Sequence, residues 1–374
     1  MSEVPSGNKW WHATPRVTAV EGRVDAIDLA RGVAVTLMIL SHGVKGLLEF
    51  EQIPGWGMVP IHAMTKFSSS LFIMVVGVAL AVAFLPHVGK ASWPRKRLKL
   101  LLAGVTIFFW YKVLTVVEMF HIAEPAQIID ALLYQTFPSF VEILGFYAIA
   151  LIWVPFFLSL WVRMPLWLRV ASPVLLAVTA ELLAARFDFW GNASLQAILV
   201  EHEELYTWGQ LSRGPLILLG LLVGELILFC QPARKRRMTL AGGLLGLSAL
   251  LFGAFLWMAS PDIHNTLVAI AMNDGKHPPE LTFMMFSMAG ALASLGLAIA
   301  GGSPLAHVLR PVTVIGSDAK AAFIFHIVVI FVVFRYLLGY WHSISYDYAL
   351  TLTLGLIIGT ALWIKLTTWI RAAQ

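Results

Sequence analysis

The chain has little of two things that soluble domains rely on, charge and cysteine. Only 13% of its 374 residues are charged, whereas a soluble domain usually carries about a quarter. Its single cysteine, Cys230, excludes an intramolecular disulfide and gives no basis for a cysteine-rich metal site. It has no glycine-rich phosphate loop, no serine nucleophile elbow and no repeat with a period of about 20–50 residues. These absences argue against a soluble catalytic domain and against a repeat array.

Apolar residues take the place of the missing charge. They make up 59% of the chain, and a run of about 20 of them is long enough to span the apolar core of a bilayer. Ten such runs predict an all-α, polytopic membrane protein with about ten transmembrane helices. The predicted spans are Ala26–Leu47, Phe67–Leu85, Leu98–Met119, Pro138–Val162, Leu166–Ala185, Gly214–Cys230, Met238–Met258, Leu281–Ala300, Val312–Leu338 and Tyr348–Ile370.

Charged residues gather at the ends of these spans, and their sign favours one orientation. With the N-terminus inside, the basic clusters at residues 95–99 and 234–237 both fall on the cytoplasmic side, as the positive-inside rule requires. Gaining or losing one helix would place one cluster on the wrong side. We therefore expect both termini in the cytoplasm, in a bacterial inner membrane. The outer side holds few cations: Arg186, Arg213 and Lys276 in loops, with Lys66 and Arg335 near helix ends.

The net charge of +5 does not indicate nucleic-acid binding, because lipid phosphate accounts for basic residues at helix ends. Residues 1–22 are predicted to form a cytoplasmic or interfacial tail, and residues 23–374 one transmembrane domain. Membrane lipid is therefore one expected partner. The pattern specifies no oligomeric state.

The first span carries ionisable residues that are costly in lipid and so suggest a functional site. Asp28 and Arg31 are three residues apart and share a helix face. They form either an internal ion pair or a site where Arg31 holds an anionic ligand from the cytosol, and the two are compatible. His42 lies eleven residues after Arg31, roughly 16 Å along a helix. His42 is either a hydrogen-bonded packing residue or a general base.

Other spans carry isolated ionisable groups. His326, near the middle of the ninth span, is either an interhelical hydrogen-bonding residue or part of a site. Asp318 and Lys320 precede it on different faces and are expected to contact other helices. Glu142 in the fourth span, with Tyr147 just over a turn later, could accept a proton or a sugar hydroxyl. Glu225 in the sixth span is expected to pair with a cation from a neighbouring helix.

Residues 201–204, Glu-His-Glu-Glu, superficially suggest a metal site. They lack the His-Glu-x-x-His spacing that places two histidines on one helix face. We interpret this segment as a solvated loop and predict no metal in the protein.

Several segments resemble one family. The segment Arg23-x4-Asp28-x2-Arg31-Gly32-x9-His42 is similar to the first helix of the transmembrane acyltransferase superfamily. That group includes acyltransferase type 3 proteins, periplasmic-glucan succinyltransferases and heparan-α-glucosaminide N-acetyltransferase-like proteins. Further similar segments are Leu71–Gly77, with Val76 where serine is usual, Glu142–Pro155, and Ile315–His326, with Ala319 and Lys320 in place of Ser-Leu.

The resemblance implies transfer of an acetyl or succinyl group from cytosolic acyl-coenzyme A to an extracytoplasmic glycan or similar acceptor. It implies that His42 is the catalytic histidine and Arg31 an essential partner. We expect His326, Glu142 or Tyr147 to orient His42 or to stabilise the oxyanion. A proton-coupled transporter is the competing hypothesis, since intramembrane charge also suits transport, and a non-catalytic membrane subunit is a third. The expected coenzyme A-binding residues are Arg23, Arg31, Arg95, Lys96, Arg97 and Lys320.

Overall fold

The computed structural model describes residues 24–230 and 233–372, and these residues form an all-helical bundle. Ten of the described helices are long and apolar enough to cross a membrane, and each overlaps one predicted span. The prediction of an all-α, polytopic membrane protein is therefore confirmed. The predicted N-terminal tail and Arg23 lie outside the described residues.

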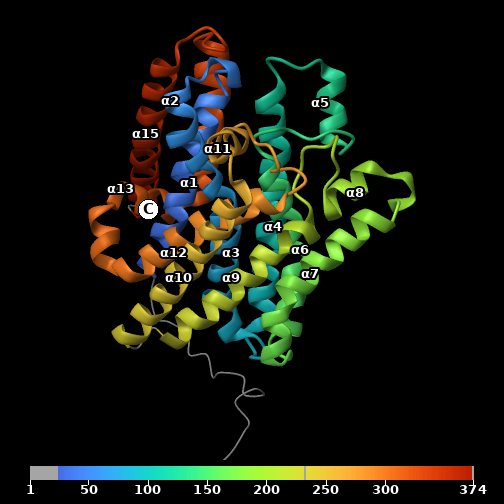
Figure 1. Ribbon diagram of the computed structural model, residues 1–374, viewed down its shortest axis with the longest axis vertical. Coiled ribbons are helices and arrows are strands. Elements are labelled where there is room, and N and C mark those ends of the chain that lie inside the picture. Colours follow the sequence, from blue (N-terminus) through green and yellow to red (C-terminus); the bar gives the residue numbers. More distant parts are fainter. Residues whose placement is uncertain (1–23, 231–232, 373–374) are drawn as a thin grey trace, which may run out of the picture.

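Short helices lie in several of the connections between the spanning helices (Figure 1). The long helices are α1 (Asp25–Lys45), α3 (Phe67–Phe84), α4 (Trp93–Met119), α6 (Glu142–Trp161), α7 (Leu166–Arg186), α9 (Gln210–Cys230), α10 (Arg234–Ala259), α12 (Leu281–Val308) and α15 (Tyr346–Ala372). The short helices are α2 (Gly55–Gly57), α5 (Pro125–Leu132), α8 (Ala193–Val200), α11 (Ile263–Ala271), α13 (Arg310–Ser317) and α14 (Ala319–Val328).

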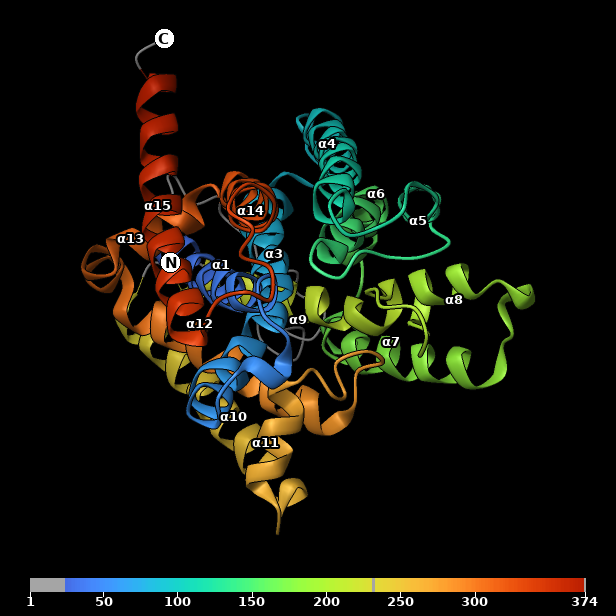
Figure 2. The same cartoon turned by 90° about the horizontal axis from the view of Figure 1, so that it is seen from above.

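Helix α1 occupies the centre of one half of the bundle, where α3, α12, α13, α14 and α15 surround it (Figure 2). Its small and branched apolar residues, including Ala30, Ala34, Val35 and Ile39, are fully buried. A residue on α1 therefore meets protein rather than lipid on nearly every side. This position allows α1 to carry polar groups that a lipid-facing helix could not.

Helix α13 crosses the start of α1 at very close range because both helices present a glycine. A Cβ atom on Gly32 would lie 1.9 Å from the carbonyl oxygen of Val312, and one on Gly316 would lie 1.9 Å from that of Asp28. No side chain fits at either position. The glycine of the Arg31–Gly32 pair is therefore a packing requirement.

The ninth predicted span, Val312–Leu338, is not one helix. The chain breaks at Asp318, whose side chain accepts a hydrogen bond from the Ala321 amide at 3.1 Å and so caps the start of α14. A short carboxylate competes well for such free amides, which favours a helix start over continuation. Helix α14 then continues as a π-helical segment, Val329–Leu337, and together they form the spanning helix Ala319–Leu337.

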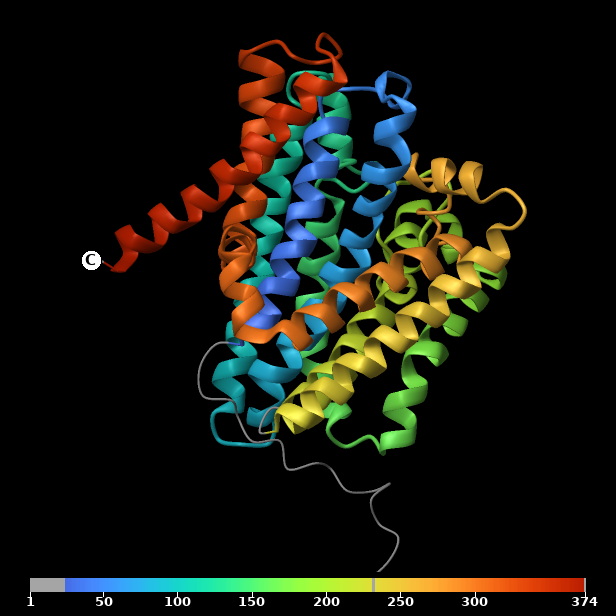
Figure 3. The same cartoon turned by 60° about the vertical axis from the view of Figure 1, so that its left-hand side comes forward.

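The two ends of the bundle differ in character (Figure 3). Helices α1, α4 and α10 begin at one end, which we call the basic end because residues 95–97 and 234–237 lie there. Helices α2, α5 and α11 lie toward the opposite end, which we call the loop end. Because α1 is continuous from Asp25 to Lys45, it joins the two.

Candidate active site

Two predicted residues from distant parts of the chain meet in the bundle. His42 on α1 and His326 on α14 lie with Nδ1 and Nε2, respectively, 3.1 Å apart, and their rings are stacked at a centroid distance of 5.4 Å. His326 is fully buried. Phe140 and Phe323 close on the His42 ring edge-on, at 5.4 and 6.2 Å. The packing fixes the orientation of the His42 ring.

The hydrogen bonds determine which nitrogen of each ring carries a proton. His326 Nδ1 lies 2.9 Å from the carbonyl oxygen of Ala322, which can only accept, so Nδ1 donates. In a neutral imidazole the other nitrogen is then an acceptor. His326 Nε2 therefore accepts from His42 Nδ1–H, and His42 Nε2 is left with its lone pair available. This is the tautomer that a general base requires.

His42 lines a small cavity of about 40 Å³ toward the loop end. Glu142, at the first turn of α6, lines it too, and its Oε1 accepts a hydrogen bond from Trp208 Nε1 at 3.0 Å. The second carboxylate oxygen of Glu142 is buried and has no hydrogen-bond partner. The structure thus brings together three predicted residues, His42, His326 and Glu142, although His326 itself does not line the cavity.

Three further lining residues were not predicted as site residues: Lys66, Asn273 and Lys276. Lys66 was counted only as a cation near a helix end, but its side chain is buried. Lys276 was counted as a loop cation, but its side chain is 15% exposed and lies 3.8 Å from Glu142. One signal in the sequence could have identified the two lysines: both are cations on the predicted outer side, where the positive-inside rule expects few.

The interpretation of residues 201–204 as a solvated loop was wrong for Glu201, which is buried. Glu201 is 2% exposed, and its carboxylate binds Arg213 Nε at 2.7 Å and His277 Nδ1 at 2.8 Å. Burial alone would raise the pKa of Glu201, but Arg213 and His277 outweigh it and lower that pKa to about 2. Arg213 also donates to the carbonyl oxygen of Lys276. The cluster therefore holds the loop that carries Lys276.

Arg31 and Asp28 form the predicted ion pair at 3.5 Å. Arg31 also donates from Nη1 to the carbonyl oxygen of Gly316 at 3.1 Å. The bond to Gly316 fastens α13 to α1 beside the glycine contact. Glu225, likewise, pairs with Arg169 at 2.9 Å, as predicted. Arg31 does not line the cavity of His42, which lies about three helical turns further along α1.

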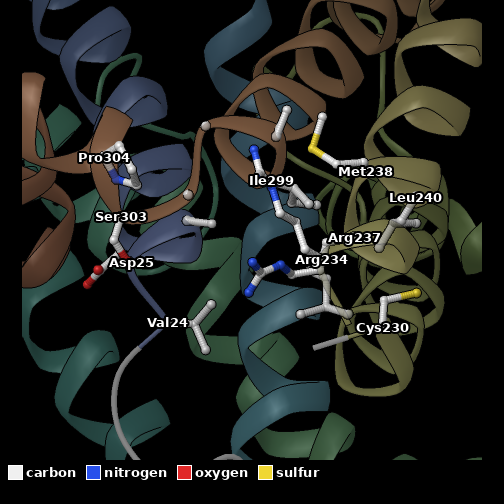
Figure 4. Close-up of a pocket in the computed structure, with 15 residues that line it drawn as sticks. Val24, Asp25, Cys230, Arg234, Arg237, Met238, Leu240, Ile299, Ser303 and Pro304 are labelled. Carbon is white, nitrogen blue, oxygen red and sulfur yellow. The ribbon is translucent and has the colours of Figure 1, made fainter. Parts of the chain in front are cut away.

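A much larger cavity, of about 470 Å³, opens at the basic end (Figure 4). Arg234 and Arg237 extend into it from the first turn of α10, opposite Asp25 and Ser303. Its wall includes Gly302, which has a positive φ of 52° and bends α12 there. A second cavity of about 240 Å³ shares Asp25 and adds His307 and Arg310.

The predicted coenzyme A-binding residues lie elsewhere at this level of the molecule. Arg95 is exposed, and Lys96 and Arg97 are half-buried, in the first turns of α4. Lys320 is exposed at the start of α14. None of these four lines the 470 Å³ cavity. In the part of the chain that the structure describes, no group of three or more His, Cys, Asp or Glu side chains is arranged to hold a metal ion.

A family model matches the first part of the chain. Residues 23–207 match the family model of the heparan-alpha-glucosaminide N-acetyltransferase catalytic region. The match supports a transmembrane acyltransferase-like family and, with the ten apolar helices, an integral membrane protein of acetyltransferase type. No curated protein and no solved structure matches the chain significantly.

The matched region contains part of the site. Arg31, His42, Lys66 and Glu142 lie within residues 23–207, whereas His326 lies beyond them. Asn273 and Lys276 also come from the later part of the chain. The cavity at His42 is therefore completed by residues outside the matched region.

Proposed function

We propose that this protein transfers an acyl group, acetyl or succinyl, from cytosolic acyl-coenzyme A to a hydroxyl or amine of an extracytoplasmic glycan or similar acceptor. The observation that carries the proposal is the state of His42. It is held by His326 with Nε2 unprotonated, and it lines a small polar cavity on the helix that joins both ends of the bundle. The family match supports the same reaction class.

In the proposed reaction, an acceptor hydroxyl or amine binds in the small cavity. His42 Nε2 takes its proton while the acceptor oxygen or nitrogen attacks the thioester carbonyl carbon. The tetrahedral intermediate collapses, the carbon–sulfur bond breaks, and the proton passes from His42 to the coenzyme A thiolate. Transient acylation of His42 itself is the alternative route. The unpartnered Glu142 oxygen is suited to accept a second hydrogen bond from the acceptor.

The proposed donor enters from the basic end. Its phosphates would meet Arg234 and Arg237, which are suited to bidentate phosphate binding. Arg95, Lys96 and Arg97 would add to the positive field there. His42 is seventeen residues from Asp25 along α1, roughly 25 Å. A donor that carries its phosphates and its thioester at opposite ends of a long flexible arm is suited to this separation.

The deciding experiment measures release of free coenzyme A from acetyl-coenzyme A by the purified protein with glucosamine as acceptor. Wild-type protein should release coenzyme A in proportion to acylated glucosamine, and a folded His42→Ala protein should not. Full activity in His42→Ala would overturn the assignment. Solute uptake into liposomes without coenzyme A release would favour the transporter, and neither signal would favour a non-catalytic subunit.

A further inference from the structure

Three lysines converge beside His42 without a matching number of carboxylates. Lys45 Nζ donates to Asn273 Oδ1 at 3.4 Å and to the carbonyl oxygen of Ala271 at 3.1 Å. Lys66 Nζ donates to the same Asn273 oxygen. One neutral amide oxygen therefore accepts from two lysine amino groups, and Asn273 and Lys66 both line the cavity.

The third lysine, Lys276, lies across the cavity. Its Nζ donates to Tyr206 and lies 3.8 Å from Glu142 Oε1. Burial lowers the pKa of Lys276, and the Glu142 carboxylate opposes that shift. Within the described residues, no carboxylate oxygen lies within 4.0 Å of Lys45 or Lys66. The cluster thus places three lysine amino groups around one paired carboxylate.

Burying a charge without a counter-charge is costly, and natural sites pair such groups. Asp274, next to Asn273, is exposed and lies beyond salt-bridge distance of Lys66, and other carboxylates of this region have partners of their own. Glu201 binds Arg213 and His277, and Glu118 accepts hydrogen bonds from the amides of Ser139 and Phe140. A ligand anion would supply the missing charge.

We propose that the cavity beside His42 is a subsite for an anionic group carried by one of the two substrates, and that Lys66 and Lys276 bind it. The inference rests on the proposed function for the identity of the substrates, but not for the existence of the subsite. At about 40 Å³ the cavity has room for a carboxylate or sulfate beside the reacting atom rather than for a further sugar ring. The anion comes either from an acidic group on the acceptor or from the free carboxylate of a succinyl donor.

Two pairs of substrates separate these sources. With acetyl-coenzyme A as donor, kcat/KM is compared for glucosamine and glucosamine 6-sulfate. With glucosamine as acceptor, it is compared for acetyl- and succinyl-coenzyme A. The anionic member of one pair should be preferred by about tenfold or more, as a charge-assisted hydrogen bond provides. Equal use of both members in both pairs would overturn the subsite.

Variants then assign the preference to the lysines. Lys66→Met and Lys276→Met should each lower kcat/KM for the preferred anionic substrate roughly 10- to 100-fold and for its neutral counterpart less than about threefold. Lys112→Met is the control, because Lys112 is a half-buried lysine that does not line this cavity and donates to the carbonyl oxygen of Leu132 at 2.7 Å. It should keep the preference. Equal losses on neutral and anionic substrates would show a general structural or transition-state role and overturn the proposal.

A binding measurement keeps the subsite testable if the protein does not transfer acyl groups. The Tm of the detergent-solubilised His42→Ala protein is measured with glucuronate and with neutral glucose. Stabilisation by glucuronate alone, lost in His42→Ala/Lys66→Met, would support the subsite even without coenzyme A release. Absence of stabilisation together with absence of any anionic preference would overturn it. Size-exclusion profiles and Tm without ligand confirm that each variant is folded.

Discussion

The two cavities near opposite ends of α1 are both lined by more basic than acidic side chains, but the kind of basic residue differs. At the basic end, Arg234 and Arg237 line a cavity of about 470 Å³. Toward the loop end, Lys66 and Lys276 line a space of about 40 Å³ beside His42. Arginine presents a planar fork that matches phosphate, whereas lysine presents a compact point charge. Under the proposed function, the first cavity would bind the phosphates of the donor, and the second would place a charge beside the reacting atom.

If the two cavities serve donor binding and chemistry separately, kinetic measurements should separate these two roles. Interactions made equally with bound substrate and transition state change KM, whereas interactions specific to the transition state change kcat. We expect changes at the basic end to appear in KM for the donor. Changes at His42 and His326 should appear in kcat. The predictions below use that division and proceed from the largest effect to the smallest.

His42→Ala should have the largest effect. Removing the general base should lower kcat by about 10²- to 10⁴-fold, while donor binding at the basic end remains. Binding of radiolabelled acetyl-coenzyme A to the variant, measured beside the rate of coenzyme A release, tests both halves. Loss of donor binding together with activity would show that the two cavities are not independent.

His326→Ala should have the next largest effect, with His326→Gln as its conservative partner. Alanine leaves His42 Nδ1–H without an acceptor and frees the ring to turn, and a displaced catalytic group can cost about 10²-fold in rate. The glutamine oxygen can still accept from His42 Nδ1–H and should restore part of kcat with KM unchanged. A merely structural role would instead lower Tm in both variants without separating their kcat values.

Sequence reasoning predicted the parts of this molecule that depend on local pattern. The ten spans followed from apolar length, and the Asp28–Arg31 pair from its helical spacing. The resemblance singled out His42 and His326, which the structure then placed 3.1 Å apart. Their role in catalysis and the cytoplasmic placement of the termini stay predictions.

The rest depended on contacts that no local pattern carries. Glu201 looked solvated because its neighbours in sequence are polar, but its partner His277 lies 76 residues away. Lys66 and Lys276 looked like loop cations because hydropathy does not distinguish a loop in solvent from one that closes a cavity. The sequence used Arg234 and Arg237 only to predict the orientation of the protein in the membrane. Their cavity forms where α10 packs against the bend of α12, and the sequence pattern does not predict that contact.

Arg234→Ala and Arg237→Ala test the binding cavity. Each should raise KM for acetyl-coenzyme A about 10-fold or more, with kcat changed little. Arg95→Ala is the matched control, because Arg95 is an exposed arginine that also lies at the basic end. It should change KM less than either α10 variant. With acetyl-pantetheine, which lacks the phosphates, wild type and all three variants should have equal KM. If Arg95→Ala raised KM more than Arg234→Ala and Arg237→Ala, the phosphate site would lie at α4, as the sequence predicted.

The smallest expected effect is on the stability of the protein. It should depend on pH through His277 and Glu201, which hold the loop of Lys276. Burial lowers the pKa of His277 from 6.5 to about 4, so the unfolded chain binds more protons between these values. Stability is then complete above pH 6.5 and is lost as the pH falls toward 4. Glu201, with its pKa lowered from 4.5 to about 2, extends the loss below pH 4.5. The lowered pKa values of His277 and of Glu201 therefore both predict that acid destabilises the protein.

We therefore expect the Tm of the purified protein to fall between pH 7 and pH 4, and His277→Gln to flatten that dependence. The contribution at stake is a few kcal/mol, since each unit of pKa shift corresponds to about 1.4 kcal/mol. His264→Gln is the control, because His264 is exposed on α11 and should leave the slope unchanged. Because the Glu201 cluster holds the loop of Lys276, His277→Gln should also weaken any discrimination between anionic and neutral substrates. An unchanged slope in His277→Gln would mean that acid acts on the molecule elsewhere and that this cluster does not set the stability of the loop end.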